Sequence, residues 1–375
     1  MLFDVVLNHP GYATMADMAS FLPDAGILAG NWQTWSPSGD LNWHSWNSLF
    51  MNYRSQGWAS WWGPDWVRAD FPDHVPGGSD DLTGQLAFLP DFRTESTSAV
   101  SLPAFFANKA DTRAEEVPGA TIRDYLVAWH TDWVRRFGID GFRVDTAKHV
   151  ELATWTELKT AAVEALNDWK AAKPEDALDD LDFWMVGEGF PPVANRDAYF
   201  PAGFDAMINF GFQSGGAQTI SRFDDIEALY ASLAAQVNGP GERNELTFAS
   251  NHDTSLFFET TGKDFAAQTK LGTVLMAMPG AIQIFYGDES GREASASGSD
   301  PKQGTRSDMN WSQLDEPERA ALLAHWQKLG KFRSRHVAVG GGEHRVLSYG
   351  GAGYAFARTR TTGGVDDAVV ILMTR

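Results

Sequence analysis

Cysteine is absent from this chain of 375 residues, and its absence excludes disulfide bonds and thiolate metal sites. Basic residues are scarce as well. The 30 Lys and Arg stand against 49 Asp and Glu, which gives a formal net charge of −19 and a pI near 4.8. Such an excess of negative charge argues against nucleic acid and anionic membranes as binding partners.

Long hydrophobic runs are also missing. The longest uncharged run, residues 271–287, is interrupted by Pro279-Gly280, which predicts the end of a helix followed by a buried strand and no membrane span. The opening MLFDVVLNH has no basic segment and no small-residue cleavage site, so it is not a signal peptide. The chain is long enough for about two domains, and its 43% of hydrophobic residues indicates a globular protein.

Four stretches each end in a polar cluster: DVVLNH (4–9), GFRVDTAKHV (141–150), WMVGEGF (184–190) and TFASNHD (247–253). Three of them run apolar residues into a carboxylate, namely Asp145, Glu188 and Asp253. A parallel barrel delivers such strand ends to one face, and glycosidic bond cleavage needs two carboxyl groups around one carbon. A single strand that ends in Asp or Glu is usually an ordinary strand end. Four matched ends in one chain are hard to explain by chance.

Two local patterns strengthen this interpretation. Arg143 lies two residues before Asp145, on the same side of a period-2 strand, where its charge favours the ionised form of Asp145. The pair Asn-His occurs at Asn8-His9 and again at Asn251-His252, each time at a strand end.

The four stretches resemble, in order, the signature regions of the α-amylase family, glycoside hydrolase family 13. LPDFRTES (89–96) is similar to a segment of that family's inserted domain. Within the family, LNWHSWNS, FWMVGEGF, FDAMINF, IQIFYGDES and GSDPKQGTRSDMNW most resemble bacterial periplasmic α-amylases. The resemblance covers nearly the whole chain.

The resemblance implies roles for the three carboxylates. Asp145 matches the nucleophile, and Arg143 favours the ionised form that a nucleophile needs. Glu188 matches the general acid and base. It follows an apolar run, and partial burial favours the protonated form that an acid catalyst requires. Asp253 matches the third carboxylate, which binds sugar hydroxyls and stabilises positive charge in the transition state.

Further positions are implied by the same resemblance. His9 and His252 match residues that hydrogen-bond the sugar being cleaved, and Lys148 and His149 match the acceptor side of the cleft. A calcium site is implied at the side chains of Asn8 and Asp91 and at the backbone carbonyl of His149. Oxygen ligands of these kinds suit Ca²⁺. Asp80 and Asp81 are weaker candidates for the remaining ligands, and the alternative for Asp91 is that it caps a turn.

The order of elements predicts an α/β protein. Strands alternate with helices, which implies a parallel sheet with helical crossovers. The resemblance makes this a (β/α)8 TIM barrel whose third strand begins near residue 4, so we expect its first two strands to be absent. We predict a partial barrel over residues 1–9 and 119–335, an inserted irregular domain over 10–118 and the start of a β domain over 336–375. The expected strands are 1–7, 141–145, 183–187, 206–210, 246–250 and 281–286, and the expected helices are 123–137, 151–170, 223–237, 266–278 and 317–332.

Tryptophan is unusually frequent, with 15 in the chain and eight between Trp32 and Trp66. Two explanations stay open. Tryptophan fills cores and closes loops, and its flat faces also stack on the C–H faces of sugar rings.

We therefore expect a retaining hydrolase of α-1,4-glucosidic bonds in starch and malto-oligosaccharides, with Ca²⁺ as cofactor and α-glucan as binding partner. By resemblance, the full-length parent is periplasmic or secreted. Three alternatives remain. They are a transglycosylase or glucan-rearranging enzyme of the same fold, a binding protein with a dead site, and an inactive fragment. The presence of all three carboxylates argues against the dead site. The unpaired edges of 1–7 and 281–286 lead us to expect that residues 1–375 alone are poorly soluble and inactive.

Overall fold

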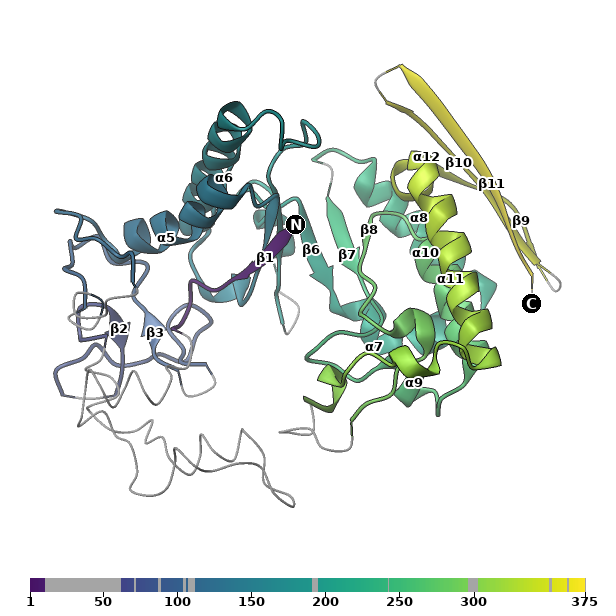
Figure 1. Cartoon of the computed structure of the whole chain (residues 1–375), viewed down its shortest axis with the longest axis horizontal. Coiled ribbons are helices and arrows are strands. Elements are labelled where there is room, and N and C mark those ends of the chain that lie inside the picture. Colours follow the sequence, from purple (N-terminus) through teal and green to yellow (C-terminus); the bar gives the residue numbers. More distant parts are fainter. Residues whose placement is uncertain are drawn as a thin grey trace. The chain divides into compact units, whose positions relative to one another are not determined.

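The computed structural model describes residues 1–10, 62–70, 72–86, 89–103, 106, 112–190, 195–241, 243–295, 303–350, 353–362 and 364–374 (Figure 1). These residues fall into two compact units, Met1–Phe204 and Asp205–Arg375. The three predicted domains divide the chain differently, and their boundaries stay predictions.

The first unit is built on three parallel strands, β1 (Leu2–Val5), β4 (Gly141–Val144) and β5 (Trp184–Gly187). β4 lies between the other two, in a register that pairs Asp4 with Arg143 and Arg143 with Val186. Phe142, Val144, Met185 and Val186 are all fully buried. Burial of successive residues is typical of parallel strands that are covered on both faces.

Two long helices, α5 (Ile122–Phe137) and α6 (Leu152–Ala172), pack against each other in this unit (Figure 1). α5 begins with a capping box between Thr121 and Asp124 and ends at Gly138 in the left-handed conformation, the residue type that this position favours. A short antiparallel pair, β2 (Val67–Arg68) and β3 (Asp91–Phe92), places Arg68 opposite Asp91. Two 3₁₀ turns complete the unit, η1 (Ala147–His149) and η2 (Arg196–Ala198).

The second unit repeats the pattern with β6 (Ala206–Asn209), β7 (Asn244–Thr247) and β8 (Ala281–Ile282), which are parallel with β7 in the middle. Its helices are α7 (Phe210–Thr219), α8 (Phe223–Val237), α9 (Phe257–Thr260), α10 (Phe265–Met276), α11 (Pro317–Arg335) and α12 (Val337–Gly341). Three 3₁₀ turns lie between α10 and α11, namely η3 (Asp288–Ser290), η4 (Gln303–Arg306) and η5 (Trp311–Gln313). None of the described helices is both long and apolar enough to span a membrane.

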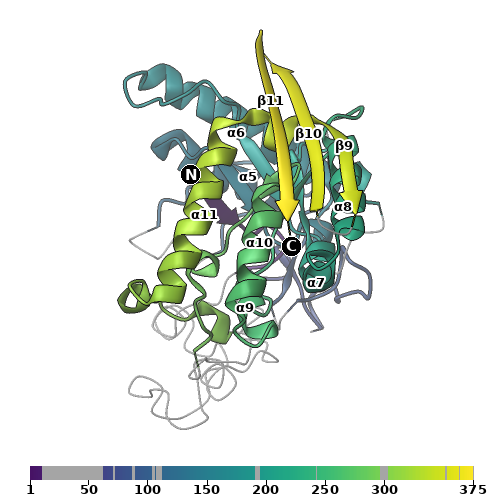
Figure 2. The ribbon, with the colours of Figure 1, turned by 90° about the vertical axis from the view of Figure 1, so that its right-hand side faces the viewer.

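A three-stranded antiparallel sheet closes the chain: β9 (Glu343–Gly350), β10 (Gly353–Thr362) and β11 (Val365–Thr374), with β10 in the middle. It packs beside α8 and α12 (Figures 1 and 2). The fully buried Arg358 of β10 donates to the carbonyl of Ala277, and Arg333 donates to the carbonyls of Met276 and Met278. The two arginines thus satisfy carbonyls at the C-terminal end of α10.

The predicted fold class is confirmed: helices accompany parallel strands, and a β sheet follows at the C-terminus. Three details differ from the expectation. α7 was not predicted, because Gly215 and Gly216 weaken its helical pattern, although Asn209 caps its start. β7 begins at the polar Asn244, two residues before the apolar run from which the strand was predicted. β8 ends at Ile282 and not at 286, because the segment beyond it forms turns that lead into η3.

Candidate active site

The end of β4 carries the first predicted carboxylate. Gly141 opens this strand, and a Cβ atom there would lie 2.2 Å from the carbonyl oxygen of Trp184, so only glycine allows β5 to approach so closely. Asp145 directly follows β4, and its N–H donates to the carbonyl of Val5. The strand ladder therefore fixes the backbone of Asp145, and its side chain is 23% exposed.

One guanidinium joins the carboxylates of the first unit. Arg143 Nη1 lies 2.6 Å from Asp145 Oδ1 and 2.9 Å from Asp4 Oδ1, and Nη2 lies 2.9 Å from Glu188 Oε1. Burial by itself lowers the pKa of Arg143, but the charges of Glu188, Asp4 and Asp145 outweigh it and hold the pKa above its ordinary value. Asp145 and Glu188 lie 43 residues apart in sequence and thus share one cation. The sequence analysis expected Arg143 to act on Asp145 but did not expect its contact with Glu188.

Glu188 follows β5 and is largely buried, with its side chain 11% exposed. Its N–H donates to the carbonyl of Val144, and its own carbonyl accepts from Ala147. Its Oε2 accepts from the N–H of Thr146 at 3.3 Å. Thr146 has φ 51°, a left-handed conformation that is unfavourable for a β-branched residue. Strain at the residue after Asp145 is typical of a functional turn.

The predicted substrate-binding residues of this unit lie close by. Burial lowers the pKa of His9, against the charge of Asp145, and burial also lowers the pKa of His149. Both imidazoles are therefore mainly neutral at pH 7 and can hydrogen-bond hydroxyl groups. Lys148 Nζ lies 3.0 Å from the carboxylate of Asp81, and His149 Nδ1 lies 2.6 Å from the carbonyl of Asp81. Asp81 thus orients both residues that were predicted for the acceptor side.

The three predicted calcium ligands converge. Asn8 Nδ2 lies 2.8 Å from Asp91 Oδ1 and 3.2 Å from the carbonyl oxygen of His149. Asn8 is fully buried and Asp91 is 1% exposed. Rotating the Asn8 amide by 180° exchanges Nδ2 for Oδ1, and three oxygens of the kind that Ca²⁺ prefers then meet at Asn8.

A second observation supports a cation here. Burial raises the pKa of Asp91 to about 8, although Arg68 lowers it. Asp91 Oδ2 makes no hydrogen bond of good geometry, and its ion-pair partner, Arg68 Nε, lies 3.1 Å away. The donor set therefore fits a hard divalent cation. Asp80 is engaged elsewhere, since it accepts from Leu82 N, Thr83 N and Thr83 Oγ1. The described residues contain no group of three His, Cys, Asp or Glu side chains that could hold a metal ion. The predicted calcium ligands are not such a group, because they include an amide oxygen and a backbone carbonyl.

The third carboxylate belongs to the second unit. Asp253 lies on the loop after β7, with its side chain 47% exposed. Its Oδ2 lies 3.0 Å from His252 Nε2, its Oδ1 lies 3.4 Å from Arg306 Nη2, and its N–H donates to Asn251 Oδ1. The structure thus pairs the adjacent side chains of His252 and Asp253.

Residues 94–339 match the family model described as alpha amylase, catalytic domain. The periplasmic α-amylase of Escherichia coli (strain K12) is 46% identical to the chain over 381 aligned residues, which cover 99% of this chain and 54% of that protein. This chain belongs to the α-amylase family. It spans about half the length of this curated relative.

Solved α-amylase structures share the fold. The α-amylase of Anoxybacillus superposes with a TM-score of 0.59 at 20% identity, and the match covers 100% of this chain and 64% of that one. The acarbose complex of the α-amylase from Geobacillus thermoleovorans has a TM-score of 0.57 at 17% identity, over 96% of this chain and 63% of that one. At these identities the likeness shows the fold alone.

Several site residues of this α-amylase family member escaped the sequence analysis. Asp4 shares Arg143 with Asp145. The sequence could have pointed to Asp4, because it is the carboxylate of the first motif. Thr146 is recognisable only from its backbone geometry. Asp81 was named only as a weaker calcium candidate, and its contacts with Lys148 and His149 were not foreseen. Arg306 lies in the quoted TRSDMNW, but its contact with Asp253 spans 53 residues.

Whether the tryptophans fill the core or stack on sugars is answered for Trp66. Trp66 is 2% exposed and contacts Trp62, Phe92, Tyr125 and Trp129 in an aromatic cluster. Trp66 therefore serves the core. Its six predecessors from Trp32 to Trp61 lie outside the described residues.

Proposed function

We propose that this protein hydrolyses α-1,4-glucosidic bonds of starch and malto-oligosaccharides with retention of configuration, through a covalent glycosyl-enzyme intermediate. The observation that carries the proposal is the shared guanidinium. Asp145 and Glu188 bind neighbouring nitrogens of Arg143, so their carboxyl groups lie close together. Retaining enzymes need a separation of about 5–5.5 Å, and inverting enzymes need a wider one that admits water.

In this mechanism Glu188 protonates the glycosidic oxygen while an oxygen of Asp145 attacks the anomeric carbon. The bond to the leaving sugar breaks and a glycosyl–Asp145 ester forms. Glu188 then removes a proton from water, which attacks the same carbon and releases Asp145. Asp4, Asp145 and Glu188 surround one cation, whose charge reduces their mutual repulsion. The side chains of Arg143 and Glu188 are largely buried, which strengthens their interaction.

The remaining residues bind and orient the sugar. Asp253 stabilises the positive charge of the oxocarbenium-like transition state. His9 and His252 donate to hydroxyls of the sugar that is cleaved, and Lys148 and His149 contact the acceptor side. The lowered pKa of His9 and of His149 supports these roles, because a neutral imidazole binds a hydroxyl without an opposing charge.

We also propose a structural Ca²⁺ held by Asn8 Oδ1, an oxygen of Asp91 and the carbonyl of His149. When bound, the ion supplies charge that ties β3 to the ends of β1 and β4. Its support is the convergence of these groups at 2.8 and 3.2 Å. Since His149 follows the Asp145 turn by four residues, an ion on its carbonyl also stabilises that turn.

Location and partners follow from the relatives. The E. coli relative is named a periplasmic α-amylase, and we propose the periplasm for this protein. α-Glucan is the partner that we propose.

Proton NMR of the first product tests the reaction. The full gene product, mixed with maltoheptaose, should release the α-anomer before mutarotation. An initial β-anomer contradicts the covalent intermediate, and an absence of any cleavage contradicts the proposed activity.

A transglycosylase is the second candidate, because the glycosyl–Asp145 ester can react with a sugar hydroxyl in place of water. The contact of Lys148 with Asp81 builds an acceptor side that suits both outcomes. Chromatography of the maltoheptaose reaction separates them, since chains longer than seven units form only by transfer.

A further inference from the structure

The loop that carries the third carboxylate is closed at its base by one side chain. Residues 251–256 leave the buried Ser250 and return at Phe257, whose N–H donates to Ser250 Oγ at 2.9 Å. The Ser250 hydroxyl in turn donates to Asp288 Oδ1 at 2.7 Å. The two ends of the loop are therefore joined to each other and to Asp288.

Asp288 is an unusual residue for this place. It is 4% exposed, its Oδ2 has no hydrogen-bond partner, and no described salt bridge includes it. Burial raises the pKa of Asp288 to about 7, and the charge of Glu289 also raises it. Hydrogen bonds with Ser250 and the Phe285 backbone and the charge of Arg292 lower it. A buried carboxylate with an unsatisfied oxygen is costly, and such a cost points to a role.

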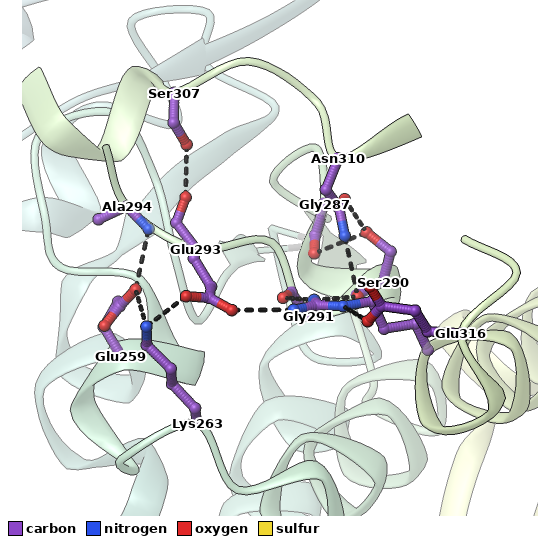
Figure 3. A network of polar contacts seen from close by, with 11 residues as sticks. Glu259, Lys263, Gly287, Ser290, Gly291, Glu293, Ala294, Ser307, Asn310 and Glu316 are labelled. Atoms are coloured by element: carbon purple, nitrogen blue, oxygen red, sulfur yellow. Dashed lines mark hydrogen bonds and ion pairs between the residues drawn. The ribbon is translucent and has the colours of Figure 1, made fainter. Parts of the chain in front are cut away.

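The backbone around Asp288 is fixed from two helices. Gln268 of α10 donates to the carbonyl of Asp288 at 2.8 Å, and Arg319 of α11 donates to the carbonyls of Ser290 and Gly291. Ser290 Oγ donates to Asn310 Oδ1 at 2.7 Å (Figure 3). The 3₁₀ turn η3 thus holds the Asp288 carboxyl in one position.

The turn η4 also contacts the loop. Thr305 Oγ1 donates to the carbonyl of His252 at 3.1 Å, and Arg306 lies 3.4 Å from Asp253. The side chains of Arg306 and Asp253 are 43% and 47% exposed, so solvent weakens this ion pair. The buried path through Ser250 therefore restrains the loop more strongly than this ion pair does.

We propose that Asp288 is a positioning residue for Asp253: it holds Ser250, Ser250 closes the loop 251–256, and the loop presents His252 and Asp253 to the substrate. The inference rests on the proposed function, since it assigns Asp253 a task in the reaction. It adds a residue that touches neither substrate nor the reacting atoms.

Two variants break the path and one preserves it. Ser250→Ala removes the donor and Asp288→Ala removes the acceptor, whereas Asp288→Asn keeps an acceptor oxygen of the same shape. We expect both alanine variants of the full gene product to lower kcat on maltoheptaose on the order of tenfold or more, with a smaller change in KM, because a displaced Asp253 weakens the transition state most. The double alanine variant should be no slower than the slower single one, and Asp288→Asn should retain most of the wild-type kcat.

The matched control is Tyr230→Phe. It removes another buried hydrogen bond of the second unit, from Tyr230 to the carbonyl of Val274 at 2.6 Å, which is not part of the loop. It should lower Tm and leave kcat within twofold. Alanine variants that lower Tm like the control and also leave kcat within twofold overturn the proposal.

Amide hydrogen exchange separates this proposal from the proposed function. Peptides covering residues 250–257 should exchange faster in Ser250→Ala, with the rest of the second unit unchanged. Wild-type protein without glucan cleavage contradicts the proposed function, while faster exchange confined to the loop still supports the positioning. Unchanged exchange in the loop overturns the positioning whether or not the protein is active.

Discussion

The carboxylates of the two units are held in different ways. Asp145 and Glu188 directly follow β4 and β5, their backbones continue the strand ladder, and one buried arginine binds both. Asp253 lies six residues beyond the last residue of β7, Thr247, and its cation, Arg306, is half exposed. A strand end thus positions a carboxylate with few helpers, whereas a loop needs a supporting layer beneath it.

The two supports also differ in charge. Arg143 is surrounded by three carboxylates whose charges raise its pKa despite burial. Asp288 is buried against a hydroxyl, and burial raises its pKa to about 7. The first support is therefore an ionic centre, and the second is a hydrogen-bonded link whose charge depends on pH near neutrality.

The largest expected effect is on chemistry in the first unit. Asp145→Asn and Glu188→Gln should each lower kcat on maltoheptaose on the order of a thousandfold or more, because each removes a group that forms or breaks a bond. Circular dichroism should show an intact fold. Asp4→Asn is the control, since Asp4 touches the same Arg143 but reacts with nothing. Turnover within tenfold of wild type in Asp145→Asn contradicts its role.

The next effect compares the two cations. Arg143→Met leaves the buried Glu188 without its cation and should destabilise the protein by about 3–5 kcal/mol. Arg306→Met removes an exposed ion pair and should cost less than about 1 kcal/mol. Urea unfolding of both variants measures the difference. Equal losses would show that the two units hold their carboxylates with similar strength.

Asp288 should make stability depend on pH. Its pKa is raised in the folded state from its ordinary 3.8 to about 7, so its contribution to stability is complete below pH 4 and is lost as the pH rises through 7. The loss is at most about 4 kcal/mol, at about 1.4 kcal/mol per pKa unit. Asp288→Asn does not titrate, so its free energy of unfolding relative to wild type should increase from pH 5 to pH 8. A difference that stays constant over this range excludes the titration of Asp288.

Calcium should distinguish the two units, because its proposed ligands all lie in the first unit. At a hundredfold excess over Kd the ion should add about 2.7 kcal/mol to the free energy of unfolding, and EDTA should remove it. Asp91→Ala should abolish this difference, and Asp80→Ala should keep it. Hydrogen exchange should slow around Asn8 and His149 and stay unchanged at residues 250–257. Identical thermal melts with calcium and with EDTA contradict the site.

Much of the fold was predictable because it depends on local patterns. The apolar strands before Asp145 and Glu188 and the amphipathic helices α5, α6, α8, α10 and α11 lie within a few residues of their expected positions. The failures had local causes too. α7 contains three glycines, and β8 ends at Ile282 because the segment beyond it forms turns that lead into η3.

The candidate site also divides into features carried by local patterns and contacts between distant residues. The sequence by itself determined the three carboxylates, the nearby Arg143 and membership of the α-amylase family, because these are carried by short motifs in a set order. Only the tertiary structure decided that Asp4 and Glu188 share Arg143, that the His149 carbonyl faces Asn8 and Asp91, and that Asp288 holds Ser250. These contacts join residues that are 38 to 141 positions apart, and no periodicity along the chain encodes a distance in space.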